Sequence, residues 1–152
     1  ILVNNAGIFL PGNIMSEDPI NFEDQFSVNV QAAYTCVRHI GRLMAARGSG
    51  HIFNITSIAG MANNTTGGSY AVTKAAMLSL NNVTRQELSK HGVKVTAIVP
   101  GPTRTDSWEG TTLPESAFVR PDDIAEMLVS TLRMSKYANV DEIVIRPLNF
   151  EL

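Results

Sequence analysis

The sequence predicts an α/β fold built around a doubly wound parallel sheet, and two observations support this. Four short apolar runs alternate along the 152-residue chain with three longer stretches that have the apolar spacing of helices. The connections between them are short, a pattern that predicts parallel strands joined by right-handed crossovers. We therefore expect about four parallel strands with helices on both faces of the sheet, in a single domain that spans residues 1–152.

The expected strands are the apolar runs 1–4, 51–56, 93–99 and 142–146. The second run is rich in β-branched residues and alternates less than a half-exposed strand would, which predicts a central strand of a parallel sheet. Pro147 follows the last run directly and ends it, because proline cannot donate a ladder hydrogen bond.

The stretches between these runs have helical spacing. Apolar residues recur every three or four positions over residues 22–47, which predicts one long helix that Asp18 or Asn21 could cap. A second helix is expected over residues 69–90. A third begins at Pro121, since the first helical position tolerates proline.

The composition excludes several classes of protein. Hydrophobic residues make up 44% of the chain, which argues against a disordered segment. The net charge is -2 without a basic run, which argues against a nucleic-acid partner, and no apolar run approaches the ~20 residues that span a membrane. Cys36 is the only cysteine, so no internal disulfide is expected and a reducing, cytoplasmic location is favoured. We expect no metal site.

Three residues near the second expected strand can carry acid–base chemistry. Tyr70 and Lys74 are four residues apart, so on a helix they share one face. Ser57 follows the second strand and should place its hydroxyl at the carboxyl end of the sheet, where open α/β folds bind ligands. A lysine ammonium favours the phenolate form of a nearby tyrosine, and a serine can donate a hydrogen bond to a carbonyl oxygen. Such a set suits interconversion of a carbonyl and an alcohol, with a cofactor supplying the hydride.

A tyrosine four residues before a lysine is common on helices and usually has no catalytic role. The catalytic interpretation gains weight because other polar segments should lie at the same edge, namely Asn4–Gly7 after the first strand and Pro100–Thr105 after the third. Asn29 is a further hint, because asparagine is a poor residue for a helix interior, although a solvent-facing asparagine is the ordinary alternative.

These residues resemble the motifs of the short-chain dehydrogenase/reductase family over nearly the whole chain. The matching segments are Asn4-Asn5-Ala6-Gly7, Asn29, Ser57, Tyr70-Ala71-Val72-Thr73-Lys74, and Pro100-Gly101 with Thr105. The resemblance implies a Rossmann-like fold and a nicotinamide cofactor. It implies that Tyr70 is the general acid/base, and that Lys74 hydrogen-bonds the nicotinamide ribose and lowers the pKa of the tyrosine.

Further roles are implied by the same resemblance. Ser57 would orient the substrate carbonyl, and Asn29 would hold a water that links Lys74 to solvent. The implied cofactor-binding residues are Asn4, Ala6 and Gly7 on the adenosine-ribose side, Pro100, Gly101, Thr103 and Thr105 on the nicotinamide side, and Tyr70 with Lys74 between them.

One family feature is missing from the chain, the glycine-rich turn that receives the cofactor pyrophosphate. The resemblance thus covers the carboxyl-terminal portion of a Rossmann-like domain, from the family's fourth strand onward. We expect a partial domain that by itself binds the cofactor poorly and does not turn over. Residues 142–147 resemble the branch that includes NADP-dependent serine and 3-hydroxy acid dehydrogenases, which favours NADP over NAD. Relatives pair their two long helices across a two-fold axis, so a homodimer or homotetramer is expected.

The expected function is that of an NAD(P)-dependent oxidoreductase acting on a small carbonyl or hydroxy compound. Two alternatives remain open, a non-catalytic binding or regulatory protein on the same fold and a sugar epimerase-type relative. The complete set of Ser57, Tyr70 and Lys74 argues against the first alternative, and the Asn-Asn-Ala-Gly segment argues against the second.

Overall fold

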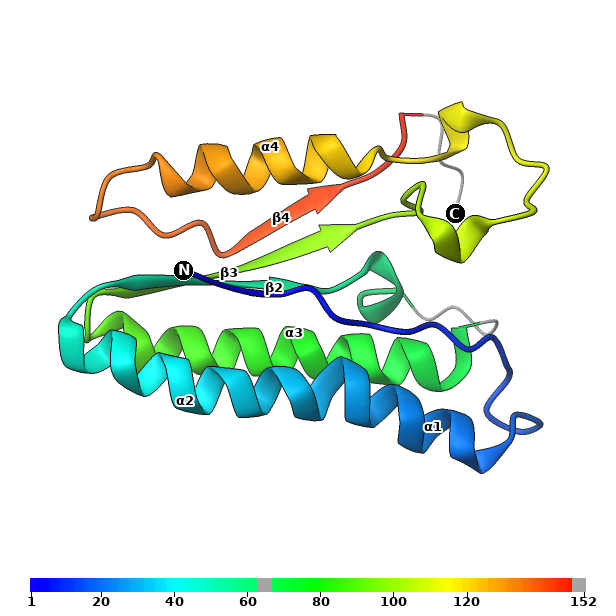
Figure 1. The fold of residues 1–152 in the computed structure, drawn as a ribbon, viewed down its shortest axis with the longest axis horizontal. Helices are drawn as coiled ribbons and strands as arrows, with labels where there is room; N and C mark the ends of the chain where they lie inside the picture. Colours follow the sequence, from blue (N-terminus) through cyan, green and yellow to red (C-terminus); the bar gives the residue numbers. More distant parts are fainter. Residues whose placement is uncertain (63–66, 149–152) are drawn as a thin grey trace.

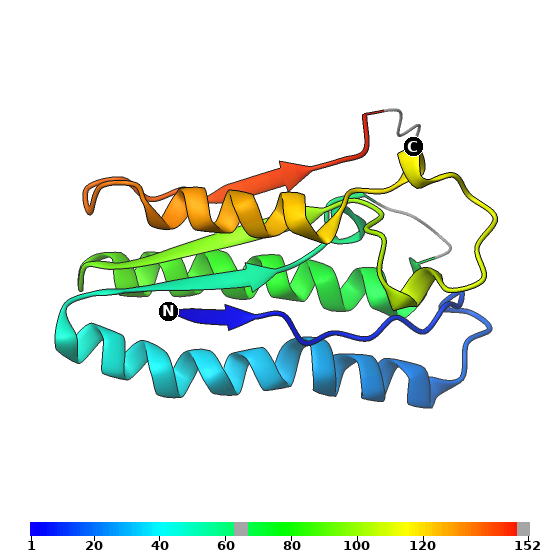
Figure 2. The ribbon, with the colours of Figure 1, turned by 45° about the horizontal axis from the view of Figure 1, so that its top comes forward.

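The computed structural model describes residues 1–62 and 67–148, which contain a four-stranded sheet. The loop expected over residues 58–68 therefore lies partly outside the described residues. The strands are β1 (Leu2–Asn4), β2 (Gly50–Ile55), β3 (Val93–Pro100) and β4 (Glu142–Ile145). They lie in the order β1-β2-β3-β4 and every neighbouring pair is parallel, which confirms the expected fold class. All carboxyl ends consequently meet at one edge of the sheet (Figure 2).

The helices are α1 (Pro19–Phe26), α2 (Ala32–Arg47), α3 (Gly68–Ser89) and α4 (Pro121–Leu132). Of the two expected caps for the first helix, Asp18 is the one used, and its side chain accepts from the backbone N–H of Ile20 at 3.0 Å. Gly48 ends α2 in the left-handed conformation, at a φ of 73°, which glycine adopts without steric cost.

The long helix expected over residues 22–47 is not continuous. A π-helix of five residues, Ser27–Gln31, separates α1 from α2. The wider π turn rotates the side chains on either side of it and is frequent at functional sites. Asn29, the residue that seemed out of place in a helix interior, lies inside this turn and is buried.

Helices cover both faces of the sheet, as expected, but the crossovers do not all have the same hand. In Figure 1, α2 and α3 lie on one face and α4 lies on the other. The chain moves across the sheet in one direction from β1 to β4, so the crossover through α4 has the opposite hand to the one through α3. The expectation that every crossover is right-handed is therefore wrong. The long connection over residues 101–120 gives the chain room to reach the second face, which a parallel sheet must also cover.

The hydrophobic core is thickest between the sheet and the α2–α3 layer. Val37 and Met44 of α2 pack with Ile52 of β2 and Val95 of β3. The two helices approach closely where Gly41 of α2 faces α3, because a Cβ at this position would lie 3.3 Å from the side chain of Leu88. This packing fixes α3 on the sheet and thereby the residues that α3 carries.

Three asparagines form a buried ladder through the same layer. Asn4 of β1 and Asn54 of β2 are register partners, and Asn4 Nδ2 donates to Asn54 Oδ1 at 2.8 Å. Asn54 Nδ2 donates in turn to Asn81 Oδ1 on α3 at 3.0 Å. Because buried amides must find partners, the ladder ties the register of the first two strands to the position of α3.

We expect the substitution Asn54→Ala to destabilise the complete protein strongly. It leaves the Asn4 amide and the Asn81 carbonyl oxygen buried without partners, and each such loss costs about 1–3 kcal/mol, so the free energy of unfolding should fall by about 2–6 kcal/mol. Urea unfolding measures the change, with the exposed Asn13→Ala as the matched control. Equal losses in the two variants would show that the ladder does not stabilise the fold.

Candidate active site

Tyr70, Lys74 and Ser57 meet at the carboxyl edge of the sheet. Tyr70 and Lys74 lie one turn apart near the start of α3, and the Lys74 ammonium nitrogen is 5.6 Å from the centroid of the Tyr70 ring. Lys74 Nζ also donates to the backbone carbonyl of Ile55, the last residue of β2, at 3.3 Å. Ser57 begins the 3₁₀ turn Ile58–Gly60 that follows β2, and hydrogen bonding connects its side chain to Tyr70.

A close backbone contact holds this turn against α3. A Cβ at Gly60 would lie only 2.6 Å from the carbonyl carbon of Lys74, so a side chain at this position would push the turn away from the helix. Gly7, after β1, is a second such position, with a virtual Cβ 3.3 Å from Asn29 Oδ1 and 3.4 Å from Lys74 Nζ. The glycines thus let three separate segments converge on Lys74.

Burial has the largest effect on the pKa values of Tyr70 and Lys74. The pKa of Tyr70 is raised above its ordinary value because the phenol is largely removed from water, and the hydrogen bond with Ser57 only partly opposes this. Burial lowers the pKa of Lys74 to about 8. The expectation that Lys74 lowers the pKa of the tyrosine is not met in this structure, since at 5.6 Å the ammonium does not offset the loss of water around the phenol.

Asn29 lies at the same place but makes contacts of a different kind from those expected. Its Oδ1 accepts from the Ile8 backbone N–H at 2.7 Å, while its Nδ2 donates to the Ile8 carbonyl at 3.0 Å and to Thr73 Oγ1 at 3.0 Å. The side chain therefore connects the segment after β1 to α3. The expected link from Asn29 through a water to Lys74 stays a prediction.

The predicted cofactor residues on the β1 side differ in their surroundings. Asn4 is buried and its amide is engaged with Asn54, so the side chain serves the sheet. Ala6 and Gly7 are exposed at the edge beside Lys74. Their small size leaves the approach to the Lys74 ammonium open.

The predicted cofactor residues on the β3 side lie at the strand's carboxyl end. Pro100 is the last residue of β3, and the N–H of the buried Gly101 donates to the Ile145 carbonyl at 2.7 Å. Thr103 Oγ1 donates to the Gly101 carbonyl at 2.9 Å. Thr105 is exposed, where a 3₁₀ turn begins. These residues and those after β1 flank the carboxyl end of β2 from its two sides.

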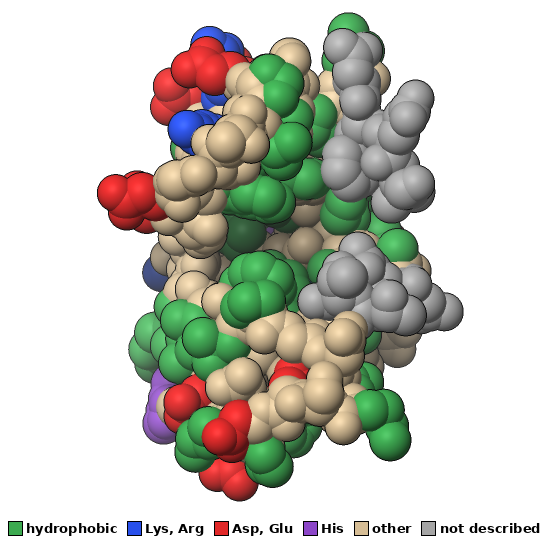
Figure 3. Space-filling view, turned by 90° about the vertical axis from the view of Figure 1, so that its right-hand side faces the viewer, with side chains coloured by type: hydrophobic (Ala, Val, Ile, Leu, Met, Phe, Trp, Pro, Cys, Tyr) green, Lys and Arg blue, Asp and Glu red, His purple; other side chains and the backbone are tan. Residues whose placement is uncertain are grey.

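The site fits a nicotinamide cofactor in its donor set. Lys74 carries a buried ammonium group with three N–H donors. Within residues 1–62 and 67–148, the acceptor that this group contacts is the Ile55 carbonyl. Ribose hydroxyl oxygens are acceptors of the kind that would complete its hydrogen bonding. The edge itself is hollowed near its middle, with apolar and uncharged side chains around the hollow (Figure 3).

Several residues of the site were missed by sequence reasoning. Gln25 and Ser69 are buried and hydrogen-bonded to each other at 2.6 Å, and Thr73 is buried beside Asn29. A signal was available, because Gln25 and Asn29 are four residues apart, as are Ser69 and Thr73, and such pairs share a helix face. Among the described residues no group of three or more histidine, cysteine, aspartate or glutamate side chains is arranged to hold a metal ion.

The chain is similar to known proteins along almost its entire length. The family model of the short chain dehydrogenase matches residues 1–115. The chain is 32% identical over 147 residues to an uncharacterized oxidoreductase of Staphylococcus epidermidis and 34% identical over 147 residues to one of Staphylococcus saprophyticus. Both matches cover 97% of this chain, but only 64% and 63% of those relatives, so the chain spans less than two thirds of their length.

Solved structures agree with this assignment. The serine dehydrogenase of Escherichia coli superposes with a TM-score of 0.87 at 26% identity, covering 99% of this chain and 65% of that structure. A short chain dehydrogenase/reductase family protein gives a TM-score of 0.85 at 31% identity, covering 95% of this chain and 64% of that one. With the family model matching most of its length and the same fold in these structures, the chain belongs to the short-chain dehydrogenase family.

Proposed function

We propose that the complete protein carrying this chain is an NAD(P)-dependent oxidoreductase that interconverts a small alcohol and the corresponding carbonyl. The observation that carries the proposal is the convergence of Ser57, Tyr70 and Lys74 at the carboxyl edge of the sheet, with the ammonium of Lys74 buried and donating to the Ile55 carbonyl. Buried, perturbed titratable groups at such an edge are typical of functional sites.

The bound nicotinamide would supply the hydride in the reducing direction. Tyr70 then donates its phenolic proton to the substrate oxygen as the carbonyl becomes an alcohol. The raised pKa keeps this phenol protonated at neutral pH, so the site is prepared to give a proton rather than to take one. Ser57 donates a hydrogen bond to the same oxygen, and Lys74 would hydrogen-bond the nicotinamide ribose.

The proposed cofactor is NADP rather than NAD. The proposal rests on the resemblance of residues 142–147 to the NADP-dependent branch of the family. Lys74 and Tyr70 would hold the nicotinamide half, and Gly7 would lie on the adenosine-ribose side. Comparing NADPH and NADH in the same carbonyl reduction tests the choice, and a clear preference for NADH would overturn it.

A cytoplasmic location is part of the proposal. It rests on Cys36, which is exposed and, as the only cysteine of the chain, has no internal disulfide partner. No helix in the described part of the chain is both long and apolar enough to cross a membrane. Expressing the complete protein with a fluorescent tag would show its location, and a secreted protein would contradict the proposal.

We expect Tyr70→Phe to lower kcat of the complete protein by about 10²–10⁴, because the ring still packs but the transferable proton is gone. Steady-state oxidation of NADPH with a small aldehyde or ketone measures this. Tyr137→Phe, in an exposed tyrosine, is the matched control and should leave kcat unchanged. Near-normal turnover in the Tyr70 variant would disprove the mechanism.

We also propose that the complete protein forms a homodimer, or a homotetramer built from two dimers, through the layer of α1, α2 and α3. This layer exposes large apolar side chains that solvent does not favour, namely Ile20, Phe22, Phe26, Leu43, Val72 and Val83. Light scattering should show an oligomer that Val83→Asp weakens and that Met127→Asp, on α4 and similarly exposed, does not. A monomeric wild type at micromolar concentration would contradict the proposal.

A further inference from the structure

Two side-chain amides hold residues 8–10 against the helix that follows them. Asn29 Oδ1 accepts from the backbone N–H of Ile8 at 2.7 Å, and Asn29 Nδ2 donates to the Ile8 carbonyl at 3.0 Å. Gln25 Oε1 accepts from the backbone N–H of Leu10 at 3.0 Å. The two amides, four residues apart in sequence, therefore bind backbone positions that are two residues apart.

The same two amides reach α3 on their other side. Gln25 Nε2 donates to Ser69 Oγ at 2.6 Å, and Asn29 Nδ2 donates to Thr73 Oγ1 at 3.0 Å. Thr73 Oγ1 donates in turn to the backbone carbonyl of Tyr70 at 2.8 Å. Gln25 and Asn29 thus form a double amide clamp, which joins residues 8–10 to the first turns of the helix that carries Tyr70 and Lys74.

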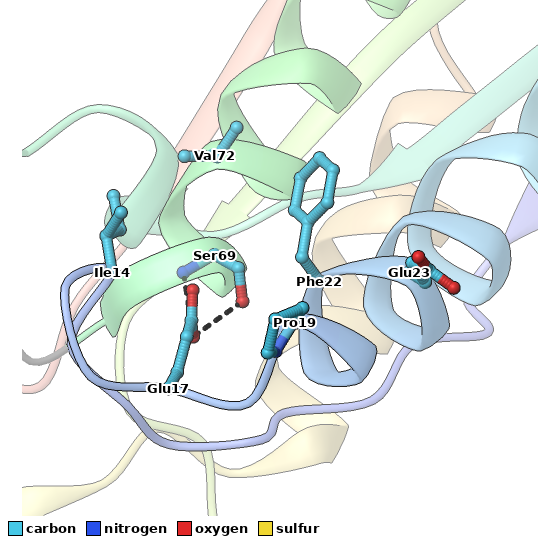
Figure 4. Close-up of a pocket in the computed structure, with 7 residues that line it drawn as sticks. All are labelled: Ile14, Glu17, Pro19, Phe22, Glu23, Ser69 and Val72. Carbon is cyan, nitrogen blue, oxygen red and sulfur yellow. Dashed lines mark hydrogen bonds between the residues drawn. The ribbon is translucent and has the colours of Figure 1, made fainter.

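Glu17 completes the outer end of this clamp. Its Oε2 accepts from Ser69 Oγ at 2.9 Å and from the Ser69 backbone N–H at 3.4 Å, at the rim of a pocket of about 400 Å³ (Figure 4). Ser69 therefore accepts from Gln25 and donates to Glu17, so its hydroxyl is used in both directions. The carboxylate also lies at the amino end of α3, where negative charge is favourable.

Phe9 is the residue that the clamp positions. It lies between the two bound positions, Ile8 and Leu10. Its ring meets the ring of Tyr70 edge-on, with 4.9 Å between the centroids and an interplanar angle of 74°. Aromatic pairs of this geometry are favourable and directional, so the position of Phe9 sets that of the phenol.

We propose that Gln25 is a positioning residue for the proton-transfer site, and that it acts by holding Phe9 against Tyr70. The proposal rests on the proposed function. Gln25 itself is fully buried and distant along the chain from the acid–base residues, yet its amide satisfies Leu10 and Ser69 at once. Within residues 1–62 and 67–148, no other side chain binds the Leu10 N–H. Replacing Gln25 therefore frees the Leu10 end of residues 8–10.

The test compares Gln25→Leu with Gln86→Leu in the complete protein. Both variants replace a glutamine by a leucine of similar size. Gln86 is exposed on α3, so Gln86→Leu serves as the control. Hydrogen exchange of the Leu10 amide should accelerate in Gln25→Leu while the Ile8 amide, held by Asn29, stays protected. Misplacing a reacting group by about 1 Å costs up to 10²-fold, so we expect kcat for carbonyl reduction to fall roughly 10- to 100-fold with the KM for NADPH unchanged.

A double-mutant cycle tests whether Gln25 acts through Phe9. If it does, Gln25→Leu adds little to the loss of kcat already caused by Phe9→Leu. Multiplying effects would overturn the proposal, and so would a normal kcat in Gln25→Leu despite faster exchange at Leu10, because Gln25 would then be merely structural. A lower melting temperature of Gln25→Leu with an unchanged kcat would likewise show that Gln25 is merely structural and would overturn the proposal.

Two further measurements keep the test decisive. If Gln25→Leu fails to fold, Gln25→Glu replaces it, since the protonated carboxyl can make both hydrogen bonds and its anion cannot donate to Ser69. Its kcat relative to wild type should then rise as the pH falls, and a pH-independent ratio would overturn the proposal. If the wild type lacks oxidoreductase activity, the proposed function fails. The positioning of Tyr70 is then judged by ultraviolet titration of its phenol, whose raised pKa should drop when Gln25→Leu frees Phe9, and an unchanged pKa refutes it.

Discussion

The site depends on the burial of one ammonium group, that of Lys74, at the carboxyl edge of the sheet. A buried charge is costly unless it is paired or hydrogen-bonded, and Lys74 Nζ donates here to a backbone carbonyl at the end of β2. The cost appears as a pKa lowered to about 8. A side chain at Gly60 would clash with the backbone of Lys74, and a side chain at Gly7 would crowd Asn29 Oδ1 and Lys74 Nζ. A ligand that supplies further acceptors would stabilise this buried ammonium.

Local irregularities of the chain gather around this ammonium. The π-helix at Ser27–Gln31 interrupts what would otherwise be one long helix, and it places Asn29 between the segment after β1 and α3. Gln25, one turn earlier, makes a second connection of this kind, between Leu10 and Ser69 of α3. Regular packing of α2 and α3 on the sheet holds these elements in place. The site is therefore rigid in its supporting parts, and its exposed residues, such as Ala6 and Phe9, lie on the surface of that support.

Most of the fold could be predicted from the sequence, and the supporting contacts of the site could not. Each strand matches its expected run to within one residue, and the buried central strands β2 and β3 have the apolar composition typical of a parallel sheet. Asn29 attracted attention as a poor helix residue, but the π turn around it depends on its tertiary partners. Gln25 resembles any polar helix residue until the fold buries it. The placement of α4 on the opposite face and the raised pKa of Tyr70 likewise depend on long-range packing that no local pattern records.

The central claim is that a protonated Tyr70 and a charged, buried Lys74 together reduce a carbonyl. The pH dependence of kcat/KM for carbonyl reduction by the complete protein tests it most directly, because this ratio reports the ionisation of the free enzyme. Burial lowers the pKa of Lys74, so the charge is lost as the pH rises through about 8, whereas Tyr70 keeps its proton well beyond that point. The account predicts a kcat/KM that is level below pH 8 and falls above it, and a Lys74→Met variant with a lower value and no such fall. A wild-type profile that rises or stays level through this range would contradict the account.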